Sequence, residues 1–264
     1  GLNCSFGAHD LVPYVKRLAQ CVPSPVGVHP NAGLPDAFGA YTETPETTAG
    51  LLGALIDDGF VNYVGGCCGT RPEHIRAIAT RAAGRLPRRI PASDGVLVLA
   101  GLEPKPVRRE NNVLNIGERT NVAGSAKFAR LIREGKYREA LDIAREQVEN
   151  GAQVIDVNLD DGLLDARKEM EHFLRLLAAD PDIARVPVMV DSSDFEVLLA
   201  GLKSLQGKHI ANSISLKGGE AVLLSQAREL RRLGAAVVFM AFDEAGQADT
   251  FERKTAICAR AYRL

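Results

Sequence analysis

Residues 154–162 read VIDVNLDDG, an apolar run that ends in a cluster of polar side chains. The run is short, partly β-branched and almost continuously apolar, which is typical of a strand buried on both faces of a parallel sheet. Stripes with helical spacing flank it, at Tyr137, Ala140, Leu141, Ala144 and Val148, and at Met170, Phe173, Leu174 and Leu177. A buried strand between two amphipathic helices predicts a β/α unit, with both stripes in the core.

Similar units fill most of the chain, which predicts an α/β fold with parallel strands and crossover helices. In the second half, the predicted strands are 113–117, 154–158, 186–190, 210–213 and 237–240. In the first half, one predicted strand ends at Cys4, and two more cover 25–30 and 61–65.

Two helix starts in the first half have recognisable caps. Thr44 before Pro45 predicts an N-cap with proline at the first helical position, and Gly59 ends that helix. Thr70 and Glu73 have capping-box spacing, which predicts that the next helix begins at Thr70.

Residues 86–112 interrupt the alternation with prolines, a charge cluster and one short apolar run. We interpret them as a linker with one small strand, between a first domain at 1–85 and a second at 113–264. The alternative is one complete (β/α)₈ barrel, which needs about 250 residues. The first strand is short and the linker is long for a single barrel. The sequence therefore favours two partial (β/α)₈ TIM-type barrels: the C-terminal part of one and the N-terminal part of another.

The composition is that of a globular protein, with 46% apolar and 25% charged residues in 264 positions. A formal net charge of -1 gives no electrostatic reason to expect nucleic acid or a membrane surface as a partner. No membrane-spanning run or signal peptide is recognised, so a cytoplasmic location is expected. Because the sequence starts Gly-Leu-Asn-Cys without an initiator Met, we expect it to be part of a longer protein.

The five cysteines are an odd number, which argues against a disulfide framework and for thiols or metal ligands. Cys4, Cys67 and Cys68 each stand at or just past the end of a predicted strand, on the barrel face that carries chemistry. Three thiolates suit a catalytic zinc ion that keeps its fourth position for a thiol substrate. Neighbouring glycines, at 65, 66 and 69, would let the backbone bend to aim both adjacent sulfurs at one ion. The alternative is that these are ordinary buried thiols.

Polar side chains also stand at strand ends in the second half, at Asp156, Asn158, Asp191 and Asn212. A carboxylate and an amide at one barrel mouth can bind the amino-pyrimidine edge and ring amide of a pterin. The alternative is helix capping, which would account for Asp191 and Ser192 before the helical run 195–202.

The first half resembles the homocysteine S-methyltransferase family. The resemblance rests on GLNC at 1–4, PNAGLP at 30–35, TPE at 44–46, GGCCGT at 65–70 and PEHI at 72–75. It implies that Cys4, Cys67 and Cys68 are the ligands of a catalytic zinc ion. Cys21 and Cys258 match no ligand position, and with three thiolates and a substrate sulfur the tetrahedron needs no histidine.

The second half resembles the pterin-binding domain of cobalamin-dependent methionine synthases. The resemblance rests on NIGERTN at 115–121 with Gly124 and Ser125, DVNLDDG, VDSSDFEVLLAGL, QGKHIANSISLKGGE and GAAVVFMAFDEAGQADT. It implies that Asp191 and Asn212 contact the pterin. Glu118, Asn121, Asp156 and Asn158 would form the floor and rim of its site, and further pterin ligands would lie beyond Leu264.

Together the resemblances imply methyl transfer from 5-methyltetrahydrofolate, through cobalamin, to zinc-activated homocysteine, giving methionine and tetrahydrofolate. Methylcobalamin would be bound by a cobalamin-binding module of the same enzyme, absent from this chain. A pterin-using enzyme of the dihydropteroate synthase type is the rival interpretation, and the three cysteines argue against it because that chemistry needs no activated thiol. A second alternative is a truncated chain that binds its ligands weakly and is inactive alone.

Overall fold

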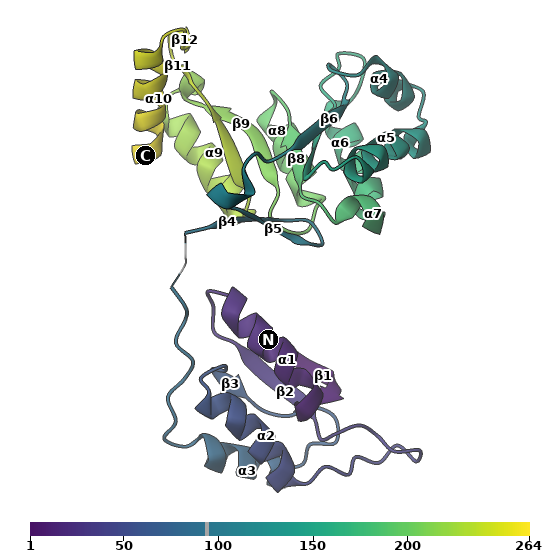
Figure 1. The fold of residues 1–264 in the computed structure, drawn as a ribbon, viewed down its shortest axis with the longest axis vertical. Helices are drawn as coiled ribbons and strands as arrows, with labels where there is room; N and C mark the ends of the chain where they lie inside the picture. The colour runs from purple at the N-terminus through teal and green to yellow at the C-terminus, as the bar shows by residue number, and fades with distance from the viewer. Residues whose placement is uncertain (93–94) are drawn as a thin grey trace. The chain divides into compact units, whose positions relative to one another are not determined.

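The computed structural model describes residues 1–92 and 95–264, and the chain folds as two compact units, Gly1–Gly95 and Val96–Leu264 (Figure 1). Each unit has its own parallel sheet, of three strands in the first and five in the second. The fold is thus mixed α/β and consistent with two partial TIM-type barrels, as predicted. The alternative of one continuous eight-stranded barrel is wrong, because the two sheets form in separate units.

The first unit alternates strand and helix throughout. Its elements are β1 (Leu2–Gly7), α1 (Ala8–Cys21), β2 (Gly27–Asn31), α2 (Pro45–Asp57), β3 (Tyr63–Val64) and α3 (Pro72–Ala82). The parallel sheet has the order β1-β2-β3. Its core gathers fully buried aliphatic side chains from the central strand and the helices, including Val15, Val28, Leu52 and Leu55. This burial fixes the sheet edge that carries the cysteines.

The caps of α2 agree with the sequence, whereas the start of α3 does not. Thr44 caps α2 by accepting a hydrogen bond from the Thr47 amide, and Gly59 follows the helix with φ +71°. The predicted capping box of Thr70 and Glu73 is wrong. Pro72 is the first residue of α3, so Arg71 is the cap, and its amide donates to Nδ1 of His74 at 3.3 Å.

The second unit begins with an antiparallel hairpin and continues as β/α units. Its elements are β4 (Leu97–Ala100), β5 (Pro104–Val107), η1 (Arg109–Asn111), β6 (Ile116–Asn121), α4 (Ala126–Arg133), α5 (Tyr137–Glu149), β7 (Val154–Asn158), α6 (Ala166–Ala178), α7 (Pro181–Ala184), β8 (Val188–Asp191), α8 (Phe195–Lys203), β9 (Ile210–Ser215), η2 (Leu216–Gly218), α9 (Glu220–Arg232), β10 (Ala236–Met240), β11 (Phe242–Asp243), β12 (Gly246–Gln247) and α10 (Phe251–Arg263). The parallel sheet has the order β10-β9-β8-β7-β6.

The two helical stripes predicted from the sequence are in the core, as expected. Phe173 of α6 meets Phe128 of α4 edge to face, with 5.3 Å between ring centroids. Met170, Leu174 and Leu177 are fully buried beside them. Burying each such side chain contributes about 1.5–3 kcal/mol, which holds the helices against the sheet.

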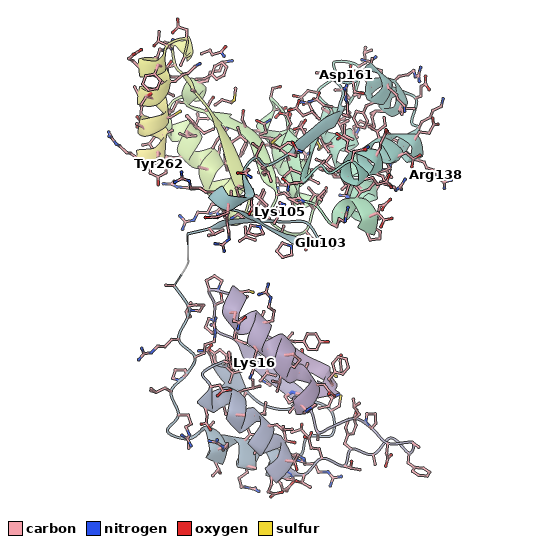
Figure 2. All side chains as sticks on the ribbon, in the orientation of Figure 1. Lys16, Glu103, Lys105, Arg138, Asp161 and Tyr262 are labelled. Atoms are coloured by element: carbon pink, nitrogen blue, oxygen red, sulfur yellow. The ribbon has the colours of Figure 1, made fainter. Side chains whose placement is uncertain are left out.

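The hairpin β4–β5 covers the amino ends of the strands, in the stretch predicted as a linker with one small strand. Leu99 is buried against Val154, Met189 and Ile210, which lie at or near the starts of β7, β8 and β9. Ala100 and Lys208 exchange two backbone hydrogen bonds of 2.9 Å. Side chains such as Glu103 and Lys105 are drawn on this hairpin in Figure 2. The hairpin therefore closes the end of the sheet opposite to its polar strand ends.

Within the described residues, no helix combines the length and the apolar character needed to cross a membrane.

A buried arginine secures the end of α1 in the first unit. Arg88 is 4% exposed, and its guanidinium donates to the carbonyl oxygens of Ala19, Val22 and Ser24 at 2.5–3.1 Å. The last carbonyls of a helix have no partner within the helix, so these bonds satisfy groups that would otherwise be buried without a donor.

We expect Arg88→Ala to destabilise the first unit by roughly 2–4 kcal/mol, because several carbonyls lose a charged donor together. Urea unfolding combined with hydrogen exchange of the α1 and β2 amides measures this loss. Arg89→Ala is the matched control, because Arg89 is the exposed neighbour. Equal effects of the two substitutions would contradict the structural role of Arg88.

Candidate functional site

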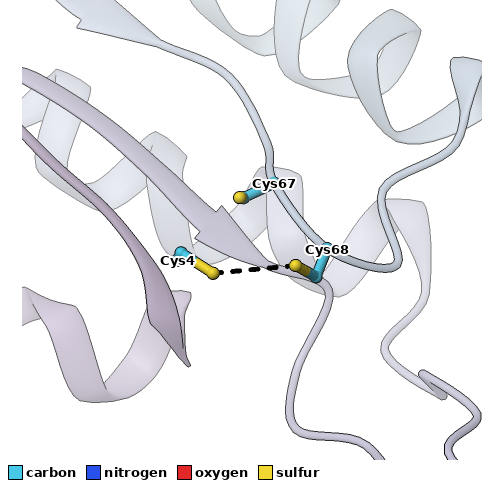
Figure 3. A group of neighbouring side chains, drawn as sticks. All are labelled: Cys4, Cys67 and Cys68. Carbon is cyan, nitrogen blue, oxygen red and sulfur yellow. Dashed lines mark hydrogen bonds between the residues drawn. The ribbon is translucent and has the colours of Figure 1, made fainter.

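Three thiols meet at the carboxyl edge of the first sheet (Figure 3). The Sγ atoms of Cys4 and Cys68 are 3.6 Å apart, and the sulfurs of Cys4, Cys67 and Cys68 all lie within 4.8 Å of one another. Ligands of a tetrahedral zinc ion with Zn–S bonds of 2.3 Å are separated by about 3.8 Å. The cluster thus has the donor type and spacing that a zinc ion requires.

Backbone geometry aims the three sulfurs. Cys4 and Ser5 both have φ +62°, inside a register shift between Asn3 and Gly7 where β1 pairs with β2. Such a bulge turns a side chain away from the regular alternation of a strand. On the other side, the Cys67 amide donates to the carbonyl of Pro30 at 2.7 Å, which extends the β2–β3 pairing to the thiols.

The three glycines around Cys67 and Cys68 act differently from one another. Gly69 has φ +76°, the left-handed conformation that glycine adopts easily. Gly65 and Gly66 have no such φ; a Cβ on either would come within 2.5 Å of the His29 ring or of the Thr70 side chain. The prediction that all three bend the backbone is therefore correct only for Gly69, and the other two allow close packing.

The thiols perturb one another electrostatically. The pKa of Cys4 is lowered, first by a hydrogen bond from the Ser5 backbone and then by the Cys68 and Cys67 side chains. The pKa of Cys68 is raised, first by its hydrogen bond with Cys4. Because the two sulfurs share one proton, the pKa of Cys4 shifts down while the pKa of Cys68 shifts up. A divalent cation would relieve the repulsion among three thiolates.

In the second unit, four of the predicted site residues form one row across the sheet. Asn121 of β6 is paired with Asn158 of β7, Asn158 with Asp191 of β8, and Asp191 with Asn212 of β9. Asn158 Nδ2 donates to Asp191 Oδ2 at 3.0 Å. The row lies at the carboxyl ends of the strands, where (β/α)₈ barrels place their sites.

Asp156 lies two residues before Asn158 on β7 and therefore on the same face of the sheet. It is 2% exposed; Oδ2 accepts from Asn121 Nδ2 at 3.1 Å, and Oδ1 has no hydrogen-bond partner in the described parts of the chain. Burial, followed by the charge of Asp191, raises the pKa of Asp156 to about 7. The exposed Glu118 also adds negative charge, so five of the six predicted residues, all but Asn212, contribute to one electrostatic environment.

The helix-capping alternative does not account for Asp191. Asp194 caps α8, with its Oδ1 accepting from the Glu196 amide at 2.8 Å. Asp191 instead receives the Asn158 bond, and its pKa is raised, first by burial. A half-buried carboxylate with one amide partner has acceptor capacity left for a ligand.

Residues 117–264 match the family model described as pterin binding enzyme, and residues 1–82 match homocysteine S-methyltransferase. The first match covers more than half of the chain. The chain belongs to the pterin binding enzyme family. The two matches, in this order, correspond to a part of methionine synthase that spans both domains, and they identify a methyl-transfer enzyme of the methionine synthase type.

Two polar residues of this pterin binding enzyme were not predicted as site residues. One forms a hydrogen bond beside the thiols and the other beside the polar strand ends. Asn31 is buried, and its Oδ1 accepts from the Cys68 amide at 3.1 Å. Asp160 accepts hydrogen bonds from Ser192 Oγ at 2.6 Å and from the Ser193 amide at 2.7 Å. Asn31 follows a predicted strand, which was a usable signal, whereas nothing distinguishes Asp160 from the acidic residue beside it.

We expect Asp156→Asn to remove a pH dependence of stability from this pterin binding enzyme. The folded pKa of about 7 lies above the ordinary value of 3.8, so the folded state holds the proton more tightly. Wild-type stability should therefore fall as the pH rises from about 4 to 7, by at most roughly 4 kcal/mol. The variant should be the more stable chain at pH 8 and should match wild type near pH 4.

Urea unfolding at a series of pH values tests this expectation. Asp142→Asn, at an exposed position on α5, controls for the loss of one carboxylate. A constant difference between wild type and Asp156→Asn at every pH would show that the carboxyl group is not held neutral by the fold.

Proposed function

We propose that the chain carries the zinc-thiolate homocysteine site and part of the 5-methyltetrahydrofolate site of a cobalamin-dependent methionine synthase. The observation that carries the proposal is the convergence of Cys4, Cys67 and Cys68 within 4.8 Å at a sheet edge. The match of residues 1–82 to homocysteine S-methyltransferase supports the same assignment.

The three cysteines would hold a zinc ion through their sulfurs. A bound zinc ion stabilises a substrate thiol as the thiolate near neutral pH, which makes it a nucleophile. The chain's own contribution is positional: the bulge at Cys4 and the turn at Gly69 fix three sulfurs on one side, so that a substrate sulfur can approach from the other.

In the second unit, the polar row would bind the pterin ring. Asp191 can accept two parallel N–H donors from an amino-pyrimidine edge, and Asn212 can donate to and accept from the adjacent ring amide. Asp156, whose pKa of about 7 leaves it partly protonated near neutral pH, can donate that proton in a hydrogen bond to a ring acceptor. Asn121 and Asn158 would hold the two carboxyl groups in place.

The methyl group would pass between the two substrates on cobalamin held by a separate cobalamin-binding module of the same enzyme. This assignment favours methionine and tetrahydrofolate as products. The alternative of a dihydropteroate synthase type enzyme leaves the thiol cluster without a chemical role.

Metal binding to the 264-residue chain is the direct test. We expect the chain to bind one Co²⁺ or Zn²⁺ ion through the three thiolates, giving an intense sulfur-to-cobalt charge-transfer band with Co²⁺. Cys67→Ser should abolish the band and lower Zn²⁺ affinity at least 100-fold, because a hard hydroxyl replaces a soft thiolate.

Cys21→Ser is the matched control, since Cys21 is an exposed thiol of the same unit. It should leave both the band and the affinity unchanged. Stoichiometric metal binding that survives Cys67→Ser would contradict the proposed site.

Folate binding tests the second half of the proposal. We expect Asp191→Asn to weaken 5-methyltetrahydrofolate binding by about 30-fold, because the charge-assisted pair is lost. Isothermal titration calorimetry measures the affinity, and Asp142→Asn serves as the control on the outer helix α5. Equal affinities of the two variants would argue against a pterin contact at Asp191.

A further inference from the structure

The loops that follow β7 and β8 begin next to the two partners of the Asn158–Asp191 hydrogen bond. Asp160 lies in the first loop, shortly after the end of β7 at Asn158. Ser192 and Ser193 begin the second loop, directly after Asp191 at the end of β8. Contacts between these two loops therefore bear directly on the position of the Asp191 carboxylate.

The carboxylate of Asp160 joins the two loops. Its Oδ1 accepts a hydrogen bond from the Ser192 hydroxyl group at 2.6 Å. Its Oδ2 accepts from the Ser193 amide at 2.7 Å and from the Ser193 hydroxyl group at 2.9 Å. Ser192 is 4% exposed, so its bond is shielded from water. Hydrogen bonds to a charged acceptor are stronger than neutral ones, so the two loops are firmly connected.

The backbone of Asp160 orients the hydrogen-bond donor of Asp191. The Asp160 amide donates to Asn158 Oδ1 at 2.9 Å. Because Oδ1 is occupied as an acceptor, the side-chain nitrogen of Asn158 points to Asp191, where it donates to Oδ2 at 3.0 Å. Asp160 thus acts on both partners of this bond: its amide orients the donor, and its carboxylate holds the residues that follow the acceptor.

Ser192 extends the network to the next strand. Its amide donates to the Asn212 carbonyl at 3.0 Å, and its Oγ accepts from the Asp194 amide at 3.0 Å. Asp194 in turn caps α8. The hydrogen bonds that begin at Asp160 therefore connect the carboxyl ends of β7, β8 and β9, which carry the polar row.

The charge of Asp160 does not by itself favour a carboxylate at this place. The pKa of Asp191 is raised, first by burial, and the charges of Asp160 and Glu118 raise it further against the hydrogen bond from Asn158. Asp160 thus opposes the ionisation that Asp191 needs in order to accept two N–H donors. What a carboxylate supplies here is two acceptor oxygens for the donors of the neighbouring loop.

We propose that Asp160 is a positioning residue of the pterin site, which fixes the Asp191 carboxylate in the orientation that receives the amino-pyrimidine edge of the ligand. The inference rests on the proposed folate function and adds a residue that acts through Asp191. A carboxylate that is already held in place loses less conformational freedom when the ligand binds, so the affinity is higher.

Asp160→Asn tests the inference in the full 264-residue chain, because it keeps the shape of the side chain but replaces one acceptor oxygen with a donor. Isothermal titration calorimetry should show about tenfold weaker binding of 5-methyltetrahydrofolate, since charge-assisted bonds between the loops are lost. A double-mutant cycle with Asp191→Asn distinguishes positioning from a general loosening of the fold. In the Asp191→Asn background, Asp160→Asn should change the affinity by less than about twofold, because the carboxylate that it positions is gone.

Asp161→Asn is the matched control and should leave the affinity unchanged. Asp161, labelled in Figure 2, is the neighbouring carboxylate of the same loop, and it accepts hydrogen bonds from Arg133 on α4 and from the Leu163 amide. Far-UV circular dichroism establishes that each variant is folded. If Asp160→Asn does not fold, Ser193→Ala replaces it: this exposed position gives up one bond to Asp160, and binding should weaken about threefold.

The positioning role would be overturned by an unchanged affinity in Asp160→Asn, or in Ser193→Ala where it takes that place. An equal loss of affinity in the wild-type and Asp191→Asn backgrounds would overturn it as well, and each of these results leaves the folate site intact. Failure of the wild-type chain to bind 5-methyltetrahydrofolate would instead overturn the folate function, and the role of Asp160 with it.

Discussion

Parallel strands direct their carboxyl ends to a single edge of a sheet, and both candidate sites depend on this constraint. In the second unit it places Asn121, Asn158, Asp191 and Asn212 in one row, although they are spread over more than 90 positions of the chain. In the first unit it brings Cys4 to Cys67 and Cys68. The apolar strands and helices bury enough surface to maintain these alignments, so the polar groups need no contacts of their own to assemble.

The parts of the fold that sequence predicts well are those with a strong periodic signal. The run at 154–158 matches β7 residue for residue, and the stripes on α5 and α6 pack into the core as predicted, with Tyr137 and Leu141 partly buried. Strand β6 spans Ile116–Asn121, whereas the predicted strand was 113–117, because the carboxyl half of β6 consists of polar residues that the apolar pattern does not mark. The predicted start of α3 is wrong because Thr70 has the residue type of an N-cap, whereas the helix begins at Pro72 and its N-cap is Arg71.

The candidate sites show a similar division. The order of the strands was enough to predict which side chains group together. It did not predict the residues that form hydrogen bonds to those side chains. Asn31 and Asp160 act through contacts with residues distant in sequence, and such contacts become visible only when the chain is folded. Close packing at Gly65 is of the same kind, because it depends on the distant His29, whereas Gly66 packs against Thr70 four residues away. A glycine in a sequence indicates freedom of the backbone but does not reveal a neighbour that needs the space.

Arg88 determines where a recombinant fragment of the first unit can end. Its guanidinium reaches back to three carbonyls at the end of α1, and its own carbonyl accepts from Asn62 at 3.0 Å. A recombinant fragment ending at residue 85, where helical periodicity stops, would discard this anchor and expose the helix end to water. A fragment that keeps the first unit intact therefore extends at least to residue 88, within the stretch 86–112 that the sequence predicts to be a linker.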